Sequence, residues 1–213
     1  MTLSETEIAF ALDQMKQLFP NASSTLTKTD PFHFLLAIIL SAQTTDKAVN
    51  EVTPALFAAY QTPMQLAQAD PKEIEQYIKK IGLYHNKARY LVACAQDLVN
   101  NFAGQVPQTR AELMSLHGVG RKTADVALAE CFQIPALAVD THVKRVANRL
   151  GMVDTADVLK IEQELMKKIP KDRWIEAHHL LIFFGRYQCL AKKPKCGQCP
   201  LSNLCEYNKK SSF

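Results

Sequence analysis

Hydrophobic residues recur three or four positions apart through most of this chain, the spacing that places side chains on one face of an α-helix. The pattern predicts helices over residues 8–19, 32–42, 74–81, 88–102, 112–116, 123–132, 143–150 and 158–169. No segment alternates between hydrophobic and polar residues for long enough to predict a β-strand. We therefore predict an all-α fold.

Residues that are typical of helix starts support several of these predicted helices. Proline at or near the first helical turn has no hydrogen bond to lose there, and three pairs place it so. These pairs are Asp30-Pro31, Thr53-Pro54 and Asp70-Pro71. Thr109, followed three residues later by Glu112, has the spacing of a capping box.

Composition narrows the class of protein. The 213 residues are 47% hydrophobic and carry a formal net charge of +4, which allows a large core and fits a polyanionic partner. No signal peptide is visible, and the longest apolar run, residues 34–40, is too short to span a bilayer. We expect a cytoplasmic monomer without membrane association. Between residues 186 and 210 the bases outnumber the single acid Glu206; they are Arg186, Lys192, Lys193, Lys195, Lys209 and Lys210.

Four cysteines near the end of the chain have the spacing Cys189-x6-Cys196-x2-Cys199-x5-Cys205. Disulfides are rare in the cytoplasm, so clustered thiols there indicate a soft metal centre. Zinc is one candidate, but zinc sites usually combine two close pairs, and only Cys196 and Cys199 form one. Cys94 and Cys131 lie in predicted helices, and we expect them to be buried thiols without chemistry.

A glycine hairpin separates two short predicted helices, residues 109–116 and 121–132. Its residues His117-Gly118-Val119-Gly120 lead directly into the second helix, whose first N–H groups and positive dipole end can hold a phosphate. Such a site grips a nucleic-acid backbone without reading its bases. A simple packing corner between helices is the alternative, and the whole string GVGRKTA favours the phosphate site over it.

Several motifs in one order resemble the endonuclease III family of DNA base-excision glycosylases, the bacterial branch of the helix-hairpin-helix superfamily. They are PFHFLLAIILSAQTTDKAVN, IGLYHNKA, GVGRKTA, AVDTHVKRVANRLG and the cysteine tail. The resemblance implies two helical subdomains, residues 24–134 with the hairpin (109–132) and residues 1–23 plus 135–213 with a C-terminal [4Fe-4S] cluster loop (189–205). It also implies that Cys189, Cys196, Cys199 and Cys205 hold the cluster, and that duplex DNA lies across the groove between the subdomains.

The resemblance assigns catalysis to Lys122 and Asp140. Lys122 would attack C1′ of the damaged nucleotide, expel the base and form a Schiff base, after which β-elimination cuts the strand on the 3′ side of the abasic site. Taken alone, Lys122 could be a solvated or phosphate-pairing lysine; we expect it to be partly buried, since burial favours a neutral amine. Asp140 precedes the helix 143–150, where an N-cap role is sufficient by itself. In the family, the matching aspartate is catalytic, and the two roles can coexist.

C1′ is unreachable while the base is stacked, so the nucleotide must leave the duplex and side chains must fill the gap. The resemblance assigns the filling to Gln43 and Leu83, supported by Ile81, although spacing alone favours a core leucine at Leu83. His142 is expected near the base pocket, with a helix-start role as the alternative.

The remaining DNA contacts are assigned to the hairpin and to the basic loop of the cluster. They are Gly118, Val119, Gly120, Arg121, Arg186, Lys192, Lys193 and Lys195, the loop lysines otherwise being a solvated charge run. Two residues depart from the family pattern: His117 replaces the usual proline, and Asp125 stands where an uncharged residue is common. His117 keeps the backbone N–H that proline lacks and could touch a phosphate, so we expect DNA binding to survive this replacement.

The implied function is a bifunctional glycosylase and abasic-site lyase that removes oxidised pyrimidines, such as thymine glycol, from duplex DNA in the bacterial nucleoid. An adenine mismatch glycosylase is less favoured, because Ile38 occupies the place of its catalytic glutamate. A non-catalytic DNA-binding module with a structural metal could use the same hairpin and loop. A Mg²⁺-dependent nuclease is weaker, since no acidic metal constellation is visible.

Overall fold

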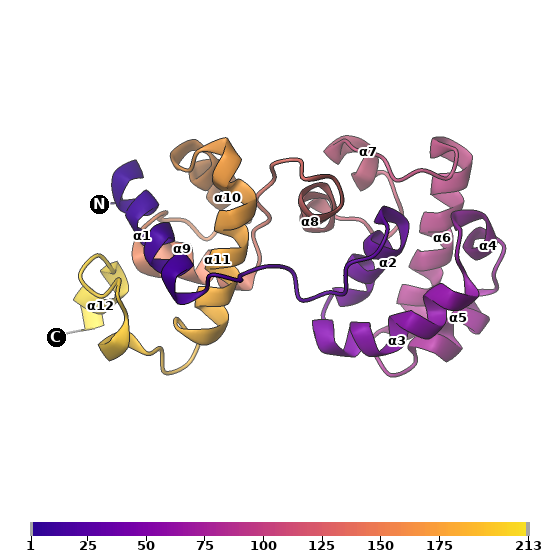
Figure 1. Cartoon of the computed structure of the whole chain (residues 1–213), viewed down its shortest axis with the longest axis horizontal. Helices are drawn as coiled ribbons and strands as arrows, with labels where there is room; N and C mark the ends of the chain where they lie inside the picture. The colour runs from indigo at the N-terminus through magenta and orange to yellow at the C-terminus, as the bar shows by residue number, and fades with distance from the viewer. Residues whose placement is uncertain (1, 212–213) are drawn as a thin grey trace. The chain divides into compact units, whose positions relative to one another are not determined.

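The computed structural model describes residues 2–211, with side chains to residue 209, and this part of the chain contains only α-helices and short 3₁₀ helices (Figure 1). The all-α prediction is therefore confirmed. The chain forms two compact units: one is Ser24–Ile134, and the other combines the segments that precede and follow it. Among the described residues, no helix has the length and apolar character needed to cross a membrane.

The unit Ser24–Ile134 is built around two central helices. Its elements are α2 (Pro31–Ser41), α3 (Asp46–Ala59), α4 (Pro63–Ala67), α5 (Pro71–Ile78), α6 (Tyr84–Phe102), α7 (Arg110–Met114) and α8 (Arg121–Phe132). Residues 32–40 of α2 are all buried, because α3, α6 and α8 pack against this helix. α6 also packs against α4 and α5, so α2 and α6 together position the rest of the unit.

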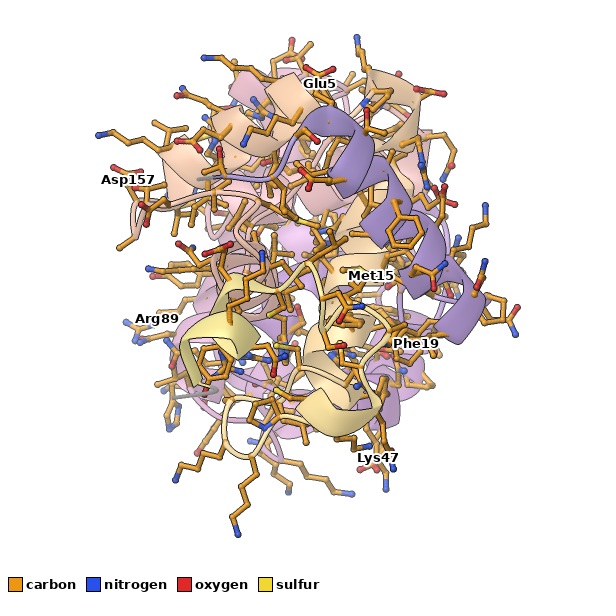
Figure 2. All side chains as sticks on the ribbon, turned by 90° about the vertical axis from the view of Figure 1, so that its left-hand side faces the viewer. Glu5, Met15, Phe19, Lys47, Arg89 and Asp157 are labelled. Atoms are coloured by element: carbon orange, nitrogen blue, oxygen red, sulfur yellow. The ribbon has the colours of Figure 1, made fainter. Side chains whose placement is uncertain are left out.

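The second unit contains both ends of the chain (Figure 1). Its helices are α1 (Glu5–Leu18), α9 (Thr141–Leu150), α10 (Val158–Lys168), α11 (Trp174–Tyr187) and α12 (Glu206–Ser211), with 3₁₀ turns at Lys171–Arg173 and Cys196–Gln198. α11 packs against both α1 and α9. Figure 2 shows Met15 and Phe19 on the α1 side of this unit, where Met15 is fully buried and Phe19 makes an edge contact with Phe183.

Four of the described helices, α3, α4, α11 and α12, lie outside the ranges predicted from the sequence. α11 was not predicted, because its sequence WIEAHHLLIFFGRY is apolar on nearly every side and shows no clear helical period. Thr53-Pro54 was expected near the start of a helix, which is wrong: α3 begins at Asp46 after the N-cap Thr45, and Pro54 lies inside it. An internal proline removes only one N–H, and the burial of Val49, Val52 and Leu56 outweighs that loss.

The helix starts at Asp30 and Asp70 follow the prediction, since each aspartate caps a helix with proline in its first turn. The capping box at Thr109 is only half formed. The Glu112 N–H donates to the Thr109 hydroxyl at 3.3 Å, but that hydroxyl in turn donates to the Glu112 carboxylate at 2.6 Å. The carboxylate therefore bonds the threonine side chain instead of its backbone, and α7 is shorter than the predicted 109–116.

Candidate active site

The hairpin between α7 and α8 depends on Gly118. Its φ of +78° lies in the left-handed region, and a Cβ there would stand 3.0 Å from the Tyr90 Cβ and 3.3 Å from the Ile39 Cγ2. Both the backbone conformation and the close packing therefore require glycine. The neighbouring Val119 is buried, and its N–H donates to the Leu116 carbonyl at 3.1 Å. These contacts seat the turn firmly against α2 and α6.

Neither the backbone conformation nor the packing at Gly120 requires glycine. Its φ of −87° suits any residue, and a Cβ there would meet nothing within 4 Å. It is the N-cap residue of α8 but offers no side chain to the first-turn N–H groups. Such a helix start presents N–H donors and a positive dipole end to an external anion.

His117 and Asp125, the two departures from the family pattern, both make internal contacts. The His117 N–H donates to Asp97 Oδ2 at 2.8 Å, and His117 Nδ1 lies 2.7 Å from the same oxygen. His117 thus has the N–H that proline would lack, and Asp97 on α6 accepts it. Asp125 is buried and its Oδ1 lies 2.6 Å from the Arg110 Nε, an ion pair that joins α7 to α8.

Lys122 is the second residue of α8 and is exposed, so the expected partial burial is wrong. Successive helical residues turn by about 100°, which places Lys122 roughly opposite the buried Ala124. Arg121 beside it is half-buried. The side chain of Lys122 is therefore accessible to a large substrate.

Asp140 is the N-cap residue of α9, as its position in the sequence suggested. Its Oδ1 accepts hydrogen bonds from the N–H groups of His142 and Val143, both at 2.8 Å. The carboxylate is consequently fixed in place by the helix that it caps. The side chain is only partly buried.

His142 packs against α11, so closely that a Cβ on Gly185 would stand 2.9 Å from the His142 Cβ. Its Nδ1 lies 3.2 Å from the Arg145 Nη2, and because arginine only donates, Nδ1 accepts. Burial lowers the pKa of His142; Asp140 works against this, whereas Arg145 and Arg186 add to it. A neutral imidazole follows from both observations.

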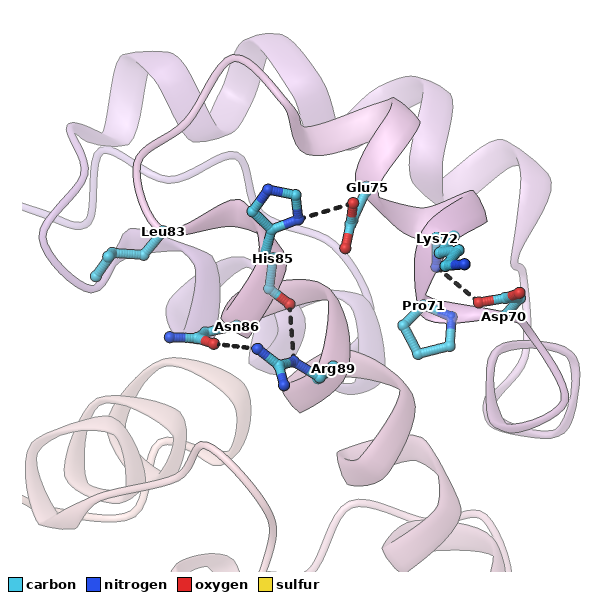
Figure 3. Close-up of a pocket in the computed structure, with 8 residues that line it drawn as sticks. All are labelled: Asp70, Pro71, Lys72, Glu75, Leu83, His85, Asn86 and Arg89. Carbon is cyan, nitrogen blue, oxygen red and sulfur yellow. Dashed lines mark hydrogen bonds and ion pairs between the residues drawn. The ribbon is translucent and has the colours of Figure 1, made fainter.

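Gln43 and Leu83 share an uncommon backbone. Their φ angles are +55° and +59°, in the left-handed region that side chains rarely adopt, and both side chains are exposed. The core position that spacing favoured for Leu83 is wrong, because 56% of this residue is exposed while the nearby Ile81 is buried. Leu83 lines the end of an open pocket, and Figure 3 shows it extending away from the paired His85 and Glu75.

The four cysteines of the tail line one small cavity, together with apolar side chains that include Leu150 and Phe184. None of the four is in a disulfide. Burial raises the pKa of both Cys199 and Cys205, so a bound cation is needed to hold them as thiolates at neutral pH.

Arg149 organises the segment around these cysteines. Its Nη1 lies 3.6 Å from Cys189 Sγ and donates to the Leu190 carbonyl at 2.7 Å, while Nη2 donates to the Ala191 carbonyl at 3.0 Å. The Cys205 thiol lies 3.2 Å from the Arg149 carbonyl. Hydrogen bonds to ligand sulfurs and burial are the protein features that tune an iron–sulfur cluster.

The site fits a multinuclear cluster. Among residues 2–211, no three His, Cys, Asp or Glu side chains are gathered tightly enough to hold a single metal ion. The four cysteines instead line one shared cavity, where they would hold an iron–sulfur cluster. Four cysteine donors in a mostly apolar pocket with an arginine near one sulfur form a suitable set.

The basic side chains of the loop before Cys196 are exposed. Lys192, Lys193 and Lys195 all face solvent, and Lys193 has a φ of +51°. Arg186, in the last turn of α11, is half-buried. Away from this loop, burial raises the pKa of Cys94 and of Cys131 to about 12, which makes both thiols poor nucleophiles, as predicted.

Comparison with known proteins gives the family. Residues 36–171 match the HhH-GPD superfamily of base excision DNA repair proteins, and residues 189–205 match the iron-sulfur binding domain of endonuclease III. The chain is 46% identical to endonuclease III of Bacillus subtilis, over 98% of this chain and 95% of that protein. It is 40% identical to endonuclease III of Escherichia coli K12, over 93% and 94% of the two chains. This chain belongs to the endonuclease III family.

Solved structures of endonuclease III agree. A trapped endonuclease III–DNA covalent intermediate superposes with a TM-score of 0.94 at 48% identity, covering 99% of this chain and all of that one. A non-covalent endonuclease III–DNA complex gives a TM-score of 0.93 at 48% identity, covering 98% of both chains. The protein is therefore a bifunctional glycosylase and abasic-site lyase of base excision repair, acts on damaged duplex DNA and carries a [4Fe-4S] cluster. These matches favour this activity over the adenine mismatch glycosylase and the non-catalytic module.

Three residues with extensive polar contacts were not singled out from the sequence. Arg145 and Arg149 lie one turn apart on α9, and Arg145 also donates to the carbonyls of Gly185 and Cys189 at 2.7 and 3.0 Å. Their four-residue spacing just before a cysteine tail was a visible signal. Lys87 is buried although it is charged, and its place on the apolar face of α6 was the corresponding signal.

Proposed function

We propose that Lys122 is the nucleophile and Asp140 its carboxylate partner. The Lys122 amine forms a bond to C1′ of the extruded nucleotide, the C1′–N bond breaks, and its electron pair leaves with the base. The sugar opens to a Schiff base on Lys122. Loss of a C2′ proton then expels the 3′ phosphate, which cuts the strand, and water releases the enzyme. The observation that carries the proposal is the likeness to a trapped covalent complex, together with an exposed lysine in the first turn of the hairpin helix.

Asp140 has a second role in this proposal besides capping α9. Its carboxylate stabilises the positive charge that builds on the sugar as the base departs, and it assists deprotonation of Lys122. A carboxylate already fixed by two backbone N–H groups needs little reorganisation when that charge appears. His142 is proposed to lie beside the base pocket.

The substrates proposed are oxidised pyrimidines, such as thymine glycol, and abasic sites, in DNA of the bacterial nucleoid. We assign phosphate contacts to the hairpin and the cluster loop, whose residues are Gly118, Val119, Gly120, Arg121, Arg186, Lys192, Lys193 and Lys195. Gln43 and Leu83 fill the gap that the nucleotide leaves. Their exposure and left-handed backbones support this role, because strained, exposed side chains are typical of functional sites.

Cys189, Cys196, Cys199 and Cys205 are proposed as the cluster ligands. Such a cluster supplies a rigid crosslink that, together with Arg149, holds the backbone of the lysine loop. No step of the reaction is assigned to it.

Borohydride trapping on a duplex with one thymine glycol tests the assignment. Borohydride reduces a Schiff base to a stable amine, so the wild-type protein should give a covalent DNA adduct and Lys122→Ala none, with duplex affinity retained. Lys160→Ala is the matched control, since Lys160 is also an exposed lysine in the first turn of a helix. Normal turnover by Lys122→Ala would refute the assignment.

A further inference from the structure

Lys87 is a buried cation to which the reaction assigns no role. Only 4% of the residue is exposed, and burial lowers its pKa. Taking an ammonium group out of water is costly, and an apolar side chain would fill the same space without that cost. The hydrogen bonds of its ammonium group therefore indicate what this buried charge contributes.

The side chain of Lys87 reaches from α6 to the turn that holds Gln43. Its Nζ donates to the Leu40 carbonyl at 2.9 Å and to the Thr44 hydroxyl at 2.6 Å. Leu40 lies in the last turn of α2, whose carbonyls lack helical donors, so a cation there is well placed. Thr44 directly follows Gln43, and its N–H donates to the Ser41 carbonyl at 3.1 Å.

The backbone of Lys87 holds the other exposed residue. Its N–H donates to the Leu83 carbonyl at 3.0 Å, in the first turn of α6. Any residue at this position would make that helical bond, so it is the side chain of Lys87 that links α6, whose N-cap residue is Leu83, to the turn around Gln43. Both Leu83 and Gln43 have left-handed backbones, which persist only where neighbouring contacts hold them.

We propose that Lys87 is a positioning residue that fixes the separation of Gln43 and Leu83, so that both enter the gap of the same extruded nucleotide. The inference rests on the gap-filling role proposed above for Gln43 and Leu83, which we call the two wedges. Without the Nζ contacts, the turn at residues 42–45 is released from α6, and the two wedges no longer act as a unit. Lys87 itself does not touch the reacting atoms.

Single-turnover rates test the proposal. Lys87→Met removes the donors and keeps the length of the side chain, and it should slow removal of thymine glycol by about 10- to 100-fold, the scale of a small misplacement at a reacting centre. Lys87→Arg should recover part of that rate. Cleavage at a preformed abasic site should change much less, because no base has to be unstacked there. Lys168→Met is the matched control: like Lys87, Lys168 donates to two acceptors in other segments, here the carbonyls of Leu3 and Met152, but it bonds to neither the turn around Gln43 nor the start of α6.

Two further variants separate this idea from the wedge role itself. Leu83→Ala and Gln43→Ala should each slow base removal; if neither does, the wedge role fails whatever Lys87 does. If they do, the double variant Lys87→Met with Leu83→Ala should be little slower than the slower single variant, because both substitutions impair the same gap-filling function. Additive losses, or a wild-type rate for Lys87→Met, would overturn the positioning role. Equal losses on thymine glycol and abasic DNA would also overturn it, as a general structural defect.

Thr44→Val keeps the proposal testable if Lys87→Met does not fold. It removes one acceptor of Lys87 and keeps the shape of the side chain, and the Leu40 contact remains. The variant should show a smaller loss of the same kind, confined to base removal. A Thr44→Val protein with the wild-type rate would contradict the inference.

Discussion

The two proposed catalytic residues lie at the N-termini of α8 and α9, and these two helices differ in how their first N–H groups are capped. α8 follows Gly120, which has no capping side chain, and its first two residues are basic. α9 follows Asp140, whose carboxylate accepts two of its first N–H groups. The first turn of any helix has N–H groups that need an acceptor from outside the helix. α9 supplies that acceptor from its own chain, whereas α8 leaves the position to another group.

The contrast extends to the other helices of residues 24–134, all of which the structure describes. Side chains cap α2, α3, α4, α5 and α7, but not α6 or α8. The two uncapped helices begin at Leu83 and Gly120, the segments to which we assign DNA contacts. In this unit, the missing side-chain caps therefore coincide with segments for which we propose DNA contacts. Asp140 shows the converse, a cap that also places a carboxylate.

The largest expected effect separates the two roles of Asp140. Asn is as good an N-cap as Asp, so Asp140→Asn should leave the melting temperature nearly unchanged. Base removal should nevertheless slow by about 100-fold or more, because the amide has no negative charge to stabilise the sugar or to accept a proton. Quenched single-turnover assays on thymine glycol DNA measure this rate of base removal.

Two controls accompany that measurement. Asp157 caps α10 in the same way, accepting from Leu159 and Lys160 at 2.9 and 3.1 Å, so Asp157→Asn should not affect the rate. Asp140→Ala should additionally cost about 1 kcal/mol of stability through the lost cap. If Asp140→Asn removed the base at the wild-type rate, Asp140 would have only a structural role. The difference between the starts of α8 and α9 would then say nothing about catalysis.

A smaller effect should follow if α8 is given the cap that it lacks. Gly120→Ser adds a hydroxyl that can accept a first-turn N–H, in space where a Cβ meets nothing, so the fold should be kept. Duplex affinity should fall by up to about tenfold, and the salt dependence should correspond to about one phosphate contact fewer. Fluorescence anisotropy at several salt concentrations measures both quantities.

Gly120→Ala separates capping from bulk, because it adds the Cβ without an acceptor. If the hairpin amides bind a phosphate, serine should weaken binding by occupying an N–H, and alanine should weaken it only by crowding. Wild-type affinity and salt slope for both variants would mean that no phosphate approaches α8 at this point. Gly118 is not suited to the same experiment, since any side chain there collides with Tyr90.

Most of the helices that the sequence predicted have a single buried face, with the exception of α2, whose residues 32–40 are all buried. α6 and α9 have such a face, with buried residues at three- and four-residue spacing. α11 buries residues on most of its circumference, including His178 and His179, so no period marked it. α3 contains a proline that normally marks a helix start, and only its tertiary packing keeps the helix continuous.

The motifs of the candidate site could be found in the sequence, but not the contacts that shape it. The resemblance identified the hairpin, Lys122, Asp140 and the cysteine tail as segments of interest. The left-handed backbones of Gln43 and Leu83 depend on long-range contacts, such as that from Lys87 to Leu40, which no local pattern encodes. The exposure of Lys122 depends on which face of α8 packs against α2, and a short helix with small residues leaves that face ambiguous.

The smallest expected effect is a pH dependence of stability that arises at the start of α9. His142 accepts a hydrogen bond from Arg145 on Nδ1, which a protonated imidazole cannot do, and burial lowers its pKa. In the unfolded chain, histidine titrates near about 6.5. Below that pH the unfolded chain binds a proton that the folded protein does not, so the contribution of His142 to stability is present above about pH 6.5 and is lost as the pH falls below it. His142→Gln keeps an acceptor for Arg145 without a titrating group. Melting curves at pH 7 and pH 5 should therefore show a smaller drop in Tm for His142→Gln than for the wild type. Equal drops would mean that the titration of His142 does not contribute to the acid sensitivity of the fold.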